Sequence, residues 1–350
     1  MQPDDKLFSF VTVIMPIRNE ARHIKRSLSA VLAQDYPGDR MEILVVDGMS
    51  DDGTRDLIAQ EIARQENQGD APQNPLKARV ALLDNPGRIV PTAFNIGLGR
   101  ARGDIIVRVD GHCEIAPDYV RQIVQRLSQL EASAVGGPMS TIGENRVARA
   151  ISLAQSSWFG VGGVAFRTGR KEGCYVDTVA FGGYRREVFE RFGGFDEELV
   201  RNQDDEFNLR LTRGGGKIWL DPAIRSVYYS RAGFHSLWRQ YFQYGFYKVR
   251  VMQKHQTVPA WRHLVPAMFV SGLALSLFYA AVSQNFFWVV LVIAPYAAAN
   301  FSASLWASRH AWSLLPLMSL AFLTLHVAYG SGFLNGLWHW RKYWRMVPEG

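Results

Sequence analysis

The stretch Asp-Ile-Ile-Val-Arg-Val-Asp-Gly-His, residues 104–112, is the part of the sequence that decides the fold. Asp104 to Val109 is rich in β-branched residues and predicts a buried strand, and Asp110 and His112 follow directly where it ends. Residues two apart on an extended backbone project to the same side, so this carboxylate and imidazole could hold a divalent cation that keeps positions open for phosphate oxygens. The competing interpretation is a glycine turn with a capping aspartate and a solvated histidine.

Working outward, the first 140 residues alternate short apolar runs with helical patterns. The expected strands are 10–15, 42–46, 79–83, 104–109 and 134–135, and the expected helices are 21–33, 54–64, 91–100 and 117–130. This alternation predicts an α/β domain built on a mostly parallel, Rossmann-like sheet. Ligands of such sheets gather at the carboxyl ends of the strands.

The segments that follow these strands are polar. They deliver carboxylates, an amide and arginines to one edge of the sheet: Pro16, Arg18, Asn19 and Glu20 after the first strand, Asp47 and 50–54 after the second, Asp84 and Arg88 after the third, and Asp110 and His112 after the fourth. The sequence therefore predicts the functional site at this edge.

A second acidic cluster follows Gly193-Gly194-Phe195. Asp204 and Asp205 lie in a stretch whose aromatic and leucine spacing suggests the start of a helix, where the positive end of the helix dipole favours carboxylates. Capping alone does not require an adjacent pair. A carboxylate beside a bound electrophile is what a general base requires, so either aspartate is a candidate.

The distribution of charge divides the 350 residues into two halves. From Pro222 to Pro348 there is no Asp or Glu but eleven Lys and Arg, whereas the remainder carries 28 basic and 32 acidic residues. Leu264–Ser283, Phe286–Ser308 and Trp312–Trp338 contain no Lys, Arg, Asp or Glu, and each reaches the roughly 20 residues needed to cross a bilayer. We expect a membrane region here and no binding to nucleic acid, because the basic residues flank apolar spans.

The orientation of these segments stays open at this stage. Basic residues precede the first segment (Arg239 to Arg262) and follow the last (Arg341 to Arg345), and three full spans cannot place both groups on one side as the positive-inside rule asks. Either one segment is re-entrant or interfacial, or the last cluster breaks the rule. No signal peptide pattern opens the chain, so we expect the front half to be cytoplasmic, with Cys113 and Cys174 as reduced thiols.

Taken together, the motifs resemble the ordered signature of family 2 glycosyltransferases with a GT-A fold. Six motifs carry the resemblance over roughly residues 10 to 250: 16–20, 46–54, Arg88 with 95–97, 107–112, 193–197 and 203–210. The form Arg-Val-Asp-Gly-His, with 202–208 and a membrane block at the C-terminal end, is similar to the bacterial glucosyltransferases of succinoglycan biosynthesis.

The resemblance implies roles for residues in an inverting sugar transfer. Pro16, Arg18, Glu20 and Asp47 would grip the nucleoside, and Arg88 would lie near the nucleotide. Asp110 would bind the donor's diphosphate and, with His112, a Mn²⁺ or Mg²⁺ ion. Asp204 matches the catalytic base of the family by motif position, with Asp205 as a competitor. The usual Asp-x-Asp is here Asp110-Gly111-His112, which puts the second metal ligand in doubt, and no Gln-x-x-Arg-Trp follows.

The expected organisation is a GT-A domain at 1–231, an amphipathic interfacial linker at 232–257 and a transmembrane region of two to three apolar segments at 258–350. The expected activity is transfer of a hexose, with glucose favoured, from a nucleotide-sugar, with UDP favoured, to a polyprenyl-diphosphate-linked glycan at the inner or plasma membrane. Membrane lipid and other polysaccharide-assembly enzymes are further expected partners. The alternatives are a polyprenyl-phosphate sugar synthase and a non-catalytic membrane scaffold or sugar-nucleotide sensor that keeps the fold.

Overall fold

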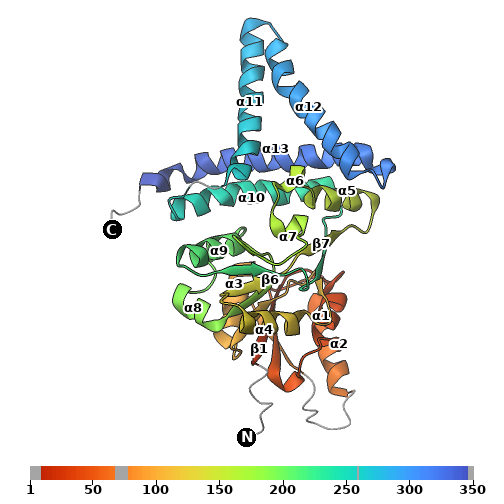
Figure 1. Cartoon of the computed structure of the whole chain (residues 1–350), viewed down its shortest axis with the longest axis vertical. Coiled ribbons are helices and arrows are strands. Elements are labelled where there is room, and N and C mark those ends of the chain that lie inside the picture. Colours follow the sequence, from red (N-terminus) through yellow and green to blue (C-terminus); the bar gives the residue numbers. More distant parts are fainter. Residues whose placement is uncertain (1–8, 68–77, 258–259, 346–350) are drawn as a thin grey trace. The chain divides into compact units, whose positions relative to one another are not determined.

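A computed structural model describes residues 9–67, 78–257 and 260–345 of the chain (Figure 1). Its internal contacts divide it into two compact units. The sheet unit comprises residues 1–140 and 169–228, and the helical unit comprises residues 141–168 and 229–350. This division differs from the expected domain 1–231, because residues 141–168 group with the C-terminal helices.

The sheet unit is built on eight strands in the order β3-β2-β1-β4-β9-β6-β10-β8. Their bounds are β1 Val11–Ile17, β2 Met41–Asp47, β3 Arg79–Asp84, β4 Ile105–Arg108, β6 Ala134–Gly136, β8 Cys174–Val176, β9 Gly182–Arg185 and β10 Ile218–Leu220. Strands β3, β2, β1 and β4 are parallel, β9 is antiparallel to both β4 and β6, β10 is parallel to β6, and β8 is antiparallel to β10. The mostly parallel α/β fold expected from the sequence is therefore confirmed.

The central strands form because their sequences suit burial on both faces. Every residue of β1 and β2 is buried, as near-continuous apolar runs predict for parallel strands covered by helices. The buried Glu42 is tolerated because its carboxylate accepts hydrogen bonds from Thr12 Oγ1 at 2.7 Å and Arg102 Nε at 2.8 Å.

The helices of the sheet unit are α1 Ile24–Leu32, α2 Thr54–Asn67, α3 Val90–Arg100, α4 Tyr119–Gln129, α8 Arg186–Phe192 and α9 Gln203–Arg213, with a 3₁₀ turn, η2, at Gly38–Arg40. Four of them, α1 to α4, agree with the expected ones to within a few residues, α9 begins where a helix start was expected, and α8 was not predicted. The chain runs from β1 outward to β2 and β3, and then returns through α3 to β4 on the other side of β1. This reversal between β1 and β4 is the topological switch point at which such sheets bind ligands.

A second, three-stranded sheet has the order β5-β11-β7, with β5 at Cys113–Ile115, β11 at Ser226–Tyr229 and β7 at Met139–Ile142. Strand β5 follows His112 directly. Its antiparallel pairing with β11 aligns Cys113 with Tyr228. The segment after β4 is thereby held on both sides, by the main sheet before Asp110 and by β11 after His112.

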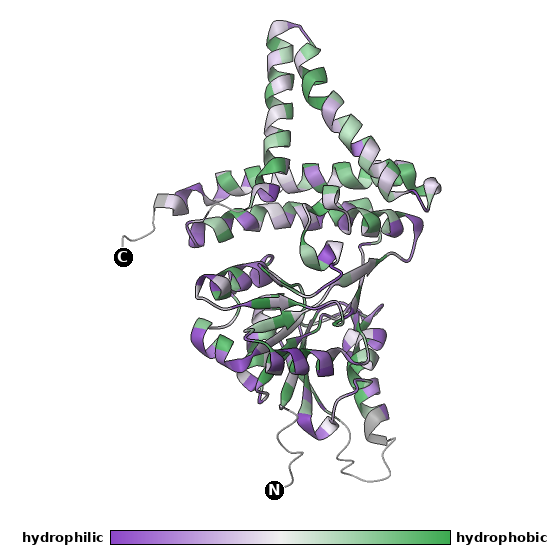
Figure 2. Ribbon diagram, in the orientation of Figure 1, coloured by the Kyte–Doolittle hydropathy of each residue, from purple (hydrophilic) through white to green (hydrophobic). Residues whose placement is uncertain are grey.

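The helical unit contains α5 Arg146–Gln155, α6 Trp158–Val161, α7 Ala165–Thr168, α10 Phe234–Lys254, α11 Trp261–Ser283, α12 Phe287–Ala307 and α13 Leu315–His339, with 3₁₀ turns η3 at Trp312–Leu314 and η4 at Trp340–Arg345. Three segments are long and apolar enough to cross a membrane, namely Trp261–Ser283, Phe287–Ala307 and Trp312–Trp344. Figure 2 shows that α11 and α12 are mostly apolar, whereas α10 mixes apolar and polar residues. The expected linker at 232–257 is thus a single long helix.

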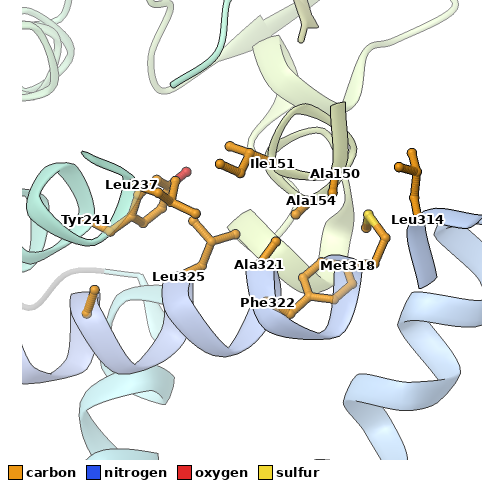
Figure 3. Close-up of a cluster of buried hydrophobic side chains, with 11 residues drawn as sticks. Ala150, Ile151, Ala154, Leu237, Tyr241, Leu314, Met318, Ala321, Phe322 and Leu325 are labelled. Atoms are coloured by element: carbon orange, nitrogen blue, oxygen red, sulfur yellow. The ribbon is translucent and has the colours of Figure 1, made fainter. Parts of the chain in front are cut away.

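A buried apolar cluster joins α5, α10 and α13 (Figure 3). It contains Ala150, Ile151 and Ala154 of α5, Leu237 and Tyr241 of α10, Leu314 at the end of η3, and Met318, Ala321, Phe322, Leu325 and Ala328 of α13. The apolar face of α5 is therefore buried against these helices, which is why residues 141–168 belong to this unit.

The aromatic core beneath α9 supplies a test of the fold. Phe207 is fully buried and its ring lies 5.0 Å from that of Phe189 and 5.4 Å from that of Phe195. Phe207→Ala removes this packing and leaves a cavity, so we expect it to lower the free energy of unfolding by about 3–5 kcal/mol. Phe207→Leu should cost clearly less. Thermal unfolding of both variants measures the difference, and equal melting temperatures for Phe207→Ala and the unchanged protein would contradict this account.

Candidate active site

Three loops meet at the carboxyl edge of the sheet and are tied to one another by hydrogen bonds. Asn19 after β1 receives a hydrogen bond from the Asp51 backbone N–H at 3.1 Å and donates one to the Asp51 carboxylate at 2.9 Å. The backbone N–H of Glu20 donates to Thr54 Oγ1 at 2.8 Å. Arg18 Nη1 donates to the carbonyl oxygen of Arg88 after β3, at 3.3 Å. The loops after β1, β2 and β3 therefore form one connected rim, as the sequence predicts.

The backbone of this rim is unusually strained. Asn19, Met49, Arg88 and Asn202 have φ values between 54° and 63°, in the left-handed region that side chains with a Cβ rarely adopt. Asn19, Met49 and Arg88 lie one in each of the three loops, and Asn202 directly precedes α9. Such strain persists only where the surrounding structure fixes the backbone, and it concentrates at functional sites.

The centre of the site is the guanidinium of Arg108, the last residue of β4. It donates to both carboxylate oxygens of Asp110, from Nε at 2.8 Å and Nη2 at 3.0 Å, and its Nη1 lies 3.7 Å from Asp204 Oδ2. Only 5% of the residue is exposed, and the rings of Phe181 and Phe195 lie 5.9 and 5.7 Å from its guanidinium carbon. Arg108 thus connects the two candidate carboxylates that the sequence places 94 residues apart.

The electrostatics of this group follow from its burial. Burial opposes the charge on Arg108, but Asp110 and then Asp204 outweigh that effect, so the pKa of the guanidinium lies above its ordinary value. Burial raises the pKa of Asp204 above its ordinary value, and the neighbouring Arg108 only partly offsets this. Within the described chain, the buried Arg108 Nη1 has no acceptor at hydrogen-bond distance, and its contact with Asp204 is an ion pair at 3.7 Å.

Asp204 and its acidic neighbours have different surroundings. Asp204 lies in the first turn of α9, where its Oδ1 accepts the backbone N–H of Asp205 at 2.9 Å, and it is the aspartate paired with Arg108. Glu206 is buried and pairs with Arg210 through two hydrogen bonds of 3.0 Å. Glu206 therefore stabilises the helix, and the contact with Arg108 distinguishes Asp204 from Asp205.

Two side chains fix the loop before α9. Asn95 of α3 accepts the backbone N–H of Phe195 at 2.8 Å and donates to the carbonyl oxygen of the same residue at 2.8 Å. Arg210 donates to the carbonyl oxygens of Phe192 and Gly194. Together they hold residues 192–195 in place. The 193–195 motif is therefore a structural support for α9.

His112 is oriented by a carboxylate. Its Nδ1 lies 2.7 Å from Glu20 Oε1, and both side chains are 17% exposed. Gly111 allows this approach, because a Cβ at that position would meet Glu20 Cγ at 2.9 Å and Ile17 Cγ2 at 2.9 Å. Since a carboxylate only accepts, Nδ1 donates, and the lone pair of the neutral ring is then on Nε2.

This arrangement fits a divalent cation held mainly by substrate. Metal-binding histidines commonly donate their second ring nitrogen to a carboxylate, as His112 does to Glu20. Among the described residues, no group of three or more His, Cys, Asp and Glu side chains is arranged to hold a metal ion. A cation here would therefore have Asp110 and His112 as protein ligands and would need phosphate and water oxygens for the rest.

The remaining predicted residues lie around the same edge with unequal exposure. Pro16 is buried in β1. The pairing of β1 with β4 ends at Ile14, so the missing N–H of Pro16 removes no hydrogen bond between these two strands. Arg18 and Arg88 are exposed. The Asp47 carboxylate is fully buried and accepts hydrogen bonds from Ser50 and from Arg55. A nucleobase would therefore have to displace the Ser50 hydroxyl to bind this carboxylate.

Sequence reasoning missed Arg108, Asn95 and Arg55 as organising residues. Arg55 joins Asp47 at 2.9 Å to Asp84 at 2.7 Å, across β2 and β3. Arg108 carried a signal, because a lone charge inside an apolar run requires a buried partner, and Asn95 carried another as part of the 95–97 motif. Cys113 and Cys174 are both free thiols, as expected from the sequence.

Comparison with known proteins agrees with this architecture. The family model described as glycosyl transferase family 2 matches residues 12–193. The succinoglycan biosynthesis protein ExoA of Rhizobium meliloti (strain 1021) is 30% identical over 348 residues, 98% of this chain and 99% of that protein. A dolichyl N-acetyl-alpha-D-glucosaminyl phosphate 3-beta-D-2,3-diacetamido-2,3-dideoxy-beta-D-glucuronosyltransferase of Methanococcus voltae is 28% identical over 286 residues, 78% of this chain and 85% of that protein.

Among solved structures, the mannosyltransferase PcManGT from Pyrobaculum calidifontis, in complex with GDP-Man and Mn²⁺, has a TM-score of 0.64 and 21% sequence identity, covering 97% of this chain and 90% of that one. This likeness supports the GT-A fold. The chain belongs to glycosyltransferase family 2. It is a glycosyltransferase whose relatives take part in exopolysaccharide and lipid-linked glycan synthesis.

The raised pKa of Asp204 predicts a stability effect of its own. A carboxyl whose folded pKa is raised destabilises the fold while it is ionised, and this cost disappears as the pH falls through the folded pKa. Asp204→Asn should therefore melt at the same or a higher temperature than the unchanged protein at pH 7, and the difference should shrink towards acidic pH. Thermal unfolding across pH 4–8 measures it. A variant that is less stable at pH 7 would show instead that Asp204 is a structural residue.

Proposed function

We propose that this glycosyltransferase is a membrane-bound inverting enzyme that transfers a hexose from a nucleotide-sugar to a lipid-linked glycan during exopolysaccharide or cell-envelope polysaccharide synthesis. We favour a UDP-sugar, and glucose in particular, as donor, and a polyprenyl-diphosphate-linked glycan as acceptor. The near full-length similarity to a succinoglycan biosynthesis protein and the three candidate membrane helices support the proposal. The active site would face the cytoplasm at the inner or plasma membrane.

The observation that carries the proposal is the Arg108 cluster. It brings a carboxylate with a raised pKa, Asp204, next to Asp110, which would lie at the donor's diphosphate. A carboxylate with a raised pKa is a stronger base than an ordinary one while it remains ionised near neutral pH. Asp204 is therefore our candidate for the general base, and Asp205 serves as its matched comparison.

The proposed reaction is a single displacement. The acceptor hydroxyl oxygen attacks the anomeric carbon from the face opposite the diphosphate, and its proton passes to Asp204. The bond between the anomeric carbon and the diphosphate oxygen breaks, and its electron pair leaves with the nucleoside diphosphate. The product has the inverted anomeric configuration, and Asp204 returns its proton to solvent.

The residues of the rim would bind the donor. Arg18 and Arg88 are exposed cations suited to the nucleotide, and Pro16 with Asp47 would border the base. The hydrogen bond between His112 and Glu20 gives Glu20 the role of orienting the imidazole.

Asp110 and His112 would hold a Mn²⁺ or Mg²⁺ ion, as the donor set and the pairing of His112 with Glu20 suggest. The solved mannosyltransferase PcManGT, which shares the fold, was determined with Mn²⁺. When bound, such a cation neutralises the charge that develops on the departing diphosphate.

The test is transfer by the purified full-length chain in detergent, with Mn²⁺ or Mg²⁺, a membrane lipid extract and radiolabelled UDP- and GDP-sugars. We expect label in the organic phase that depends on the metal. Asp204→Asn should lower kcat by about 10²–10⁴-fold, and Asp110→Ala by about 10²-fold or more.

Asp205→Asn is the matched control, because it removes the adjacent carboxylate and leaves the Arg108 contact intact. It should retain activity within about threefold of the unchanged enzyme, as expected for loss of a group outside the reaction. Loss of activity in Asp205→Asn but not in Asp204→Asn would assign the base to Asp205. A soluble sugar that accepts as well as the lipid extract would contradict a lipid-linked acceptor.

The same assay distinguishes the alternatives. A polyprenyl-phosphate sugar synthase uses a phosphate oxygen as nucleophile, which needs no strong base, so Asp204→Asn would stay active. A non-catalytic scaffold or sensor would bind a nucleotide-sugar without turnover under any condition.

The charge of Arg108 gives a separate prediction for the pH profile. Its guanidinium lowers the pKa of Asp204, so Arg108→Met should raise that pKa further. Because the base must be ionised to act, the acidic limb of the kcat/KM profile should move to higher pH. Arg102→Met, which removes the more exposed arginine paired with Glu42, is the control and should leave the limb unchanged. An unmoved limb in Arg108→Met would separate Arg108 from the base.

A further inference from the structure

Three helices could cross a membrane by length and composition, yet they differ in how much protein covers them. Within the most apolar window of each segment, 17% of α11 and 11% of α12 is buried, compared with 50% of the segment 312–344 that contains α13. Large apolar side chains along α11 and α12 are open to the surroundings, including Leu275 at 68%, Phe278 at 69% and Phe286 at 72% exposed. The hairpin of α11 and α12 therefore needs lipid around it, whereas much of α13 is covered by protein.

Helix α10 packs on the C-terminal half of α13, and glycines allow the two backbones to approach closely. A Cβ on Gly245 of α10 would lie 2.1 Å from the Tyr329 carbonyl oxygen, and one on Gly332 would lie 2.0 Å from that of Phe242. Farther along, Gln253 Nε2 donates to the carbonyl oxygen of Trp340 at 2.9 Å. From Phe242 with Gly332, through Phe246 with Gly336, to Gln253 with Trp340, the contacts advance along both helices in the same direction. Helices α10 and α13 therefore run side by side (Figure 1).

Helix α10 is too polar to cross hydrocarbon. Its charged and amide side chains recur along the whole length: Arg239, Gln240, Gln243, Lys248, Arg250, Gln253 and Lys254. Charged groups at the centre of a bilayer are strongly disfavoured. The N-terminal half of α13 packs on α5, which carries the exposed Arg146 and Arg149. Both halves of α13 are thus bound to helices that must stay in contact with water or lipid headgroups.

The hairpin contacts α13 near the start of α11 and from the middle of α12 to its end. Contacts of α13 with α11 include Gly330 against Pro266, and contacts with α12 include the hydrogen bonds of Asn300 Nδ2 to the Ser319 carbonyl oxygen at 3.1 Å and of Tyr296 Oη with His326 Nδ1 at 3.0 Å. Figure 1 shows α11 and α12 rising away from α13 beyond these points. With 23 and 21 residues, each is about 32–35 Å long, enough to cross a hydrocarbon core of about 30 Å.

We infer that the chain crosses the bilayer only twice, through α11 and α12, and that α13 lies with α10 along an anionic membrane surface. This places Arg262 and Arg309, at the two ends of the hairpin, on the same side as Arg341 and Lys342. The tip, Gln284 and Asn285, is uncharged and flanked by Tyr279, Phe286 and Trp288, as interfacial belts require. The conflict between the two basic flanks disappears, because both flanks then lie at one membrane surface.

The inference rests on the membrane attachment in our proposed function, but its test needs no activity. In the full chain with Cys113→Ser and Cys174→Ser, single cysteines at Asn285 and His310 are probed with a membrane-impermeant maleimide, and tags at both termini are probed with antibodies, before and after solubilisation. We expect both tags and His310→Cys on one side and Asn285→Cys on the other. Termini on opposite sides, or Asn285→Cys on the side of the termini, would overturn the inference. Labelling after solubilisation shows that each cysteine can react.

A depth measurement tests the position of α13 directly. Leu323→Cys on α13 is compared with Leu275→Cys on α11, two exposed apolar positions near the middle of their helices. Each carries a bimane label in vesicles that contain phosphatidylglycerol and lipids brominated at different depths. We expect Leu275→Cys to be quenched most by bromine near the chain ends and Leu323→Cys by bromine near the headgroups. Equal depths would show that α13 spans the membrane.

Discussion

The buried guanidinium of Arg108 is the interaction on which the geometry of the site depends. Asp110 and Asp204 come from different parts of the chain, one from the end of β4 and one from the first turn of α9. Two carboxylates drawn together in a partly buried site repel each other unless a cation lies between them. Arg108 supplies that charge from a buried position beside the rings of Phe181 and Phe195. It thereby holds the two carboxylates near each other and partly offsets the rise that burial causes in the pKa of Asp204.

The remaining structure of the sheet unit can be understood as support for that cluster. The reversal of strand order between β1 and β4 brings the loop of Glu20 beside that of His112. The aromatic core under α9, with Asn95 and Arg210 on the preceding loop, fixes the helix that carries Asp204. Positive φ values in the surrounding loops show that the backbone there adopts unfavourable conformations, which the rest of the structure holds in place.

Local patterns explain why much of this could be predicted from the sequence. Strands β1 to β4 and their helices follow from apolar period and β-branched runs, and Asp110 and His112 follow from their place after a strand. The partners of these residues depend on long-range packing. The spacing of residues in the sequence indicates neither the contact of Arg108 with Asp204 nor that of Glu20 with His112. In the sequence, residues 141–168 look like a continuation of the α/β domain, and only the packing of the apolar face of α5 on α13 assigns them to the helical unit.

In the two-span arrangement that we infer, hydropathy alone overcounts the membrane spans. A composition window treats an apolar side chain in the same way whether lipid or protein covers it, and on α13 protein covers half of the window. Glycines at 245, 332 and 336 bring α10 and α13 into backbone contact, which suits association of helices by packing. The arginines and lysines of α10 require contact with water or lipid headgroups. Because α13 is packed against α10, the apolar α13 lies at the same membrane surface. Packing between helices, more than the composition of either one, thus determines which segments cross the bilayer.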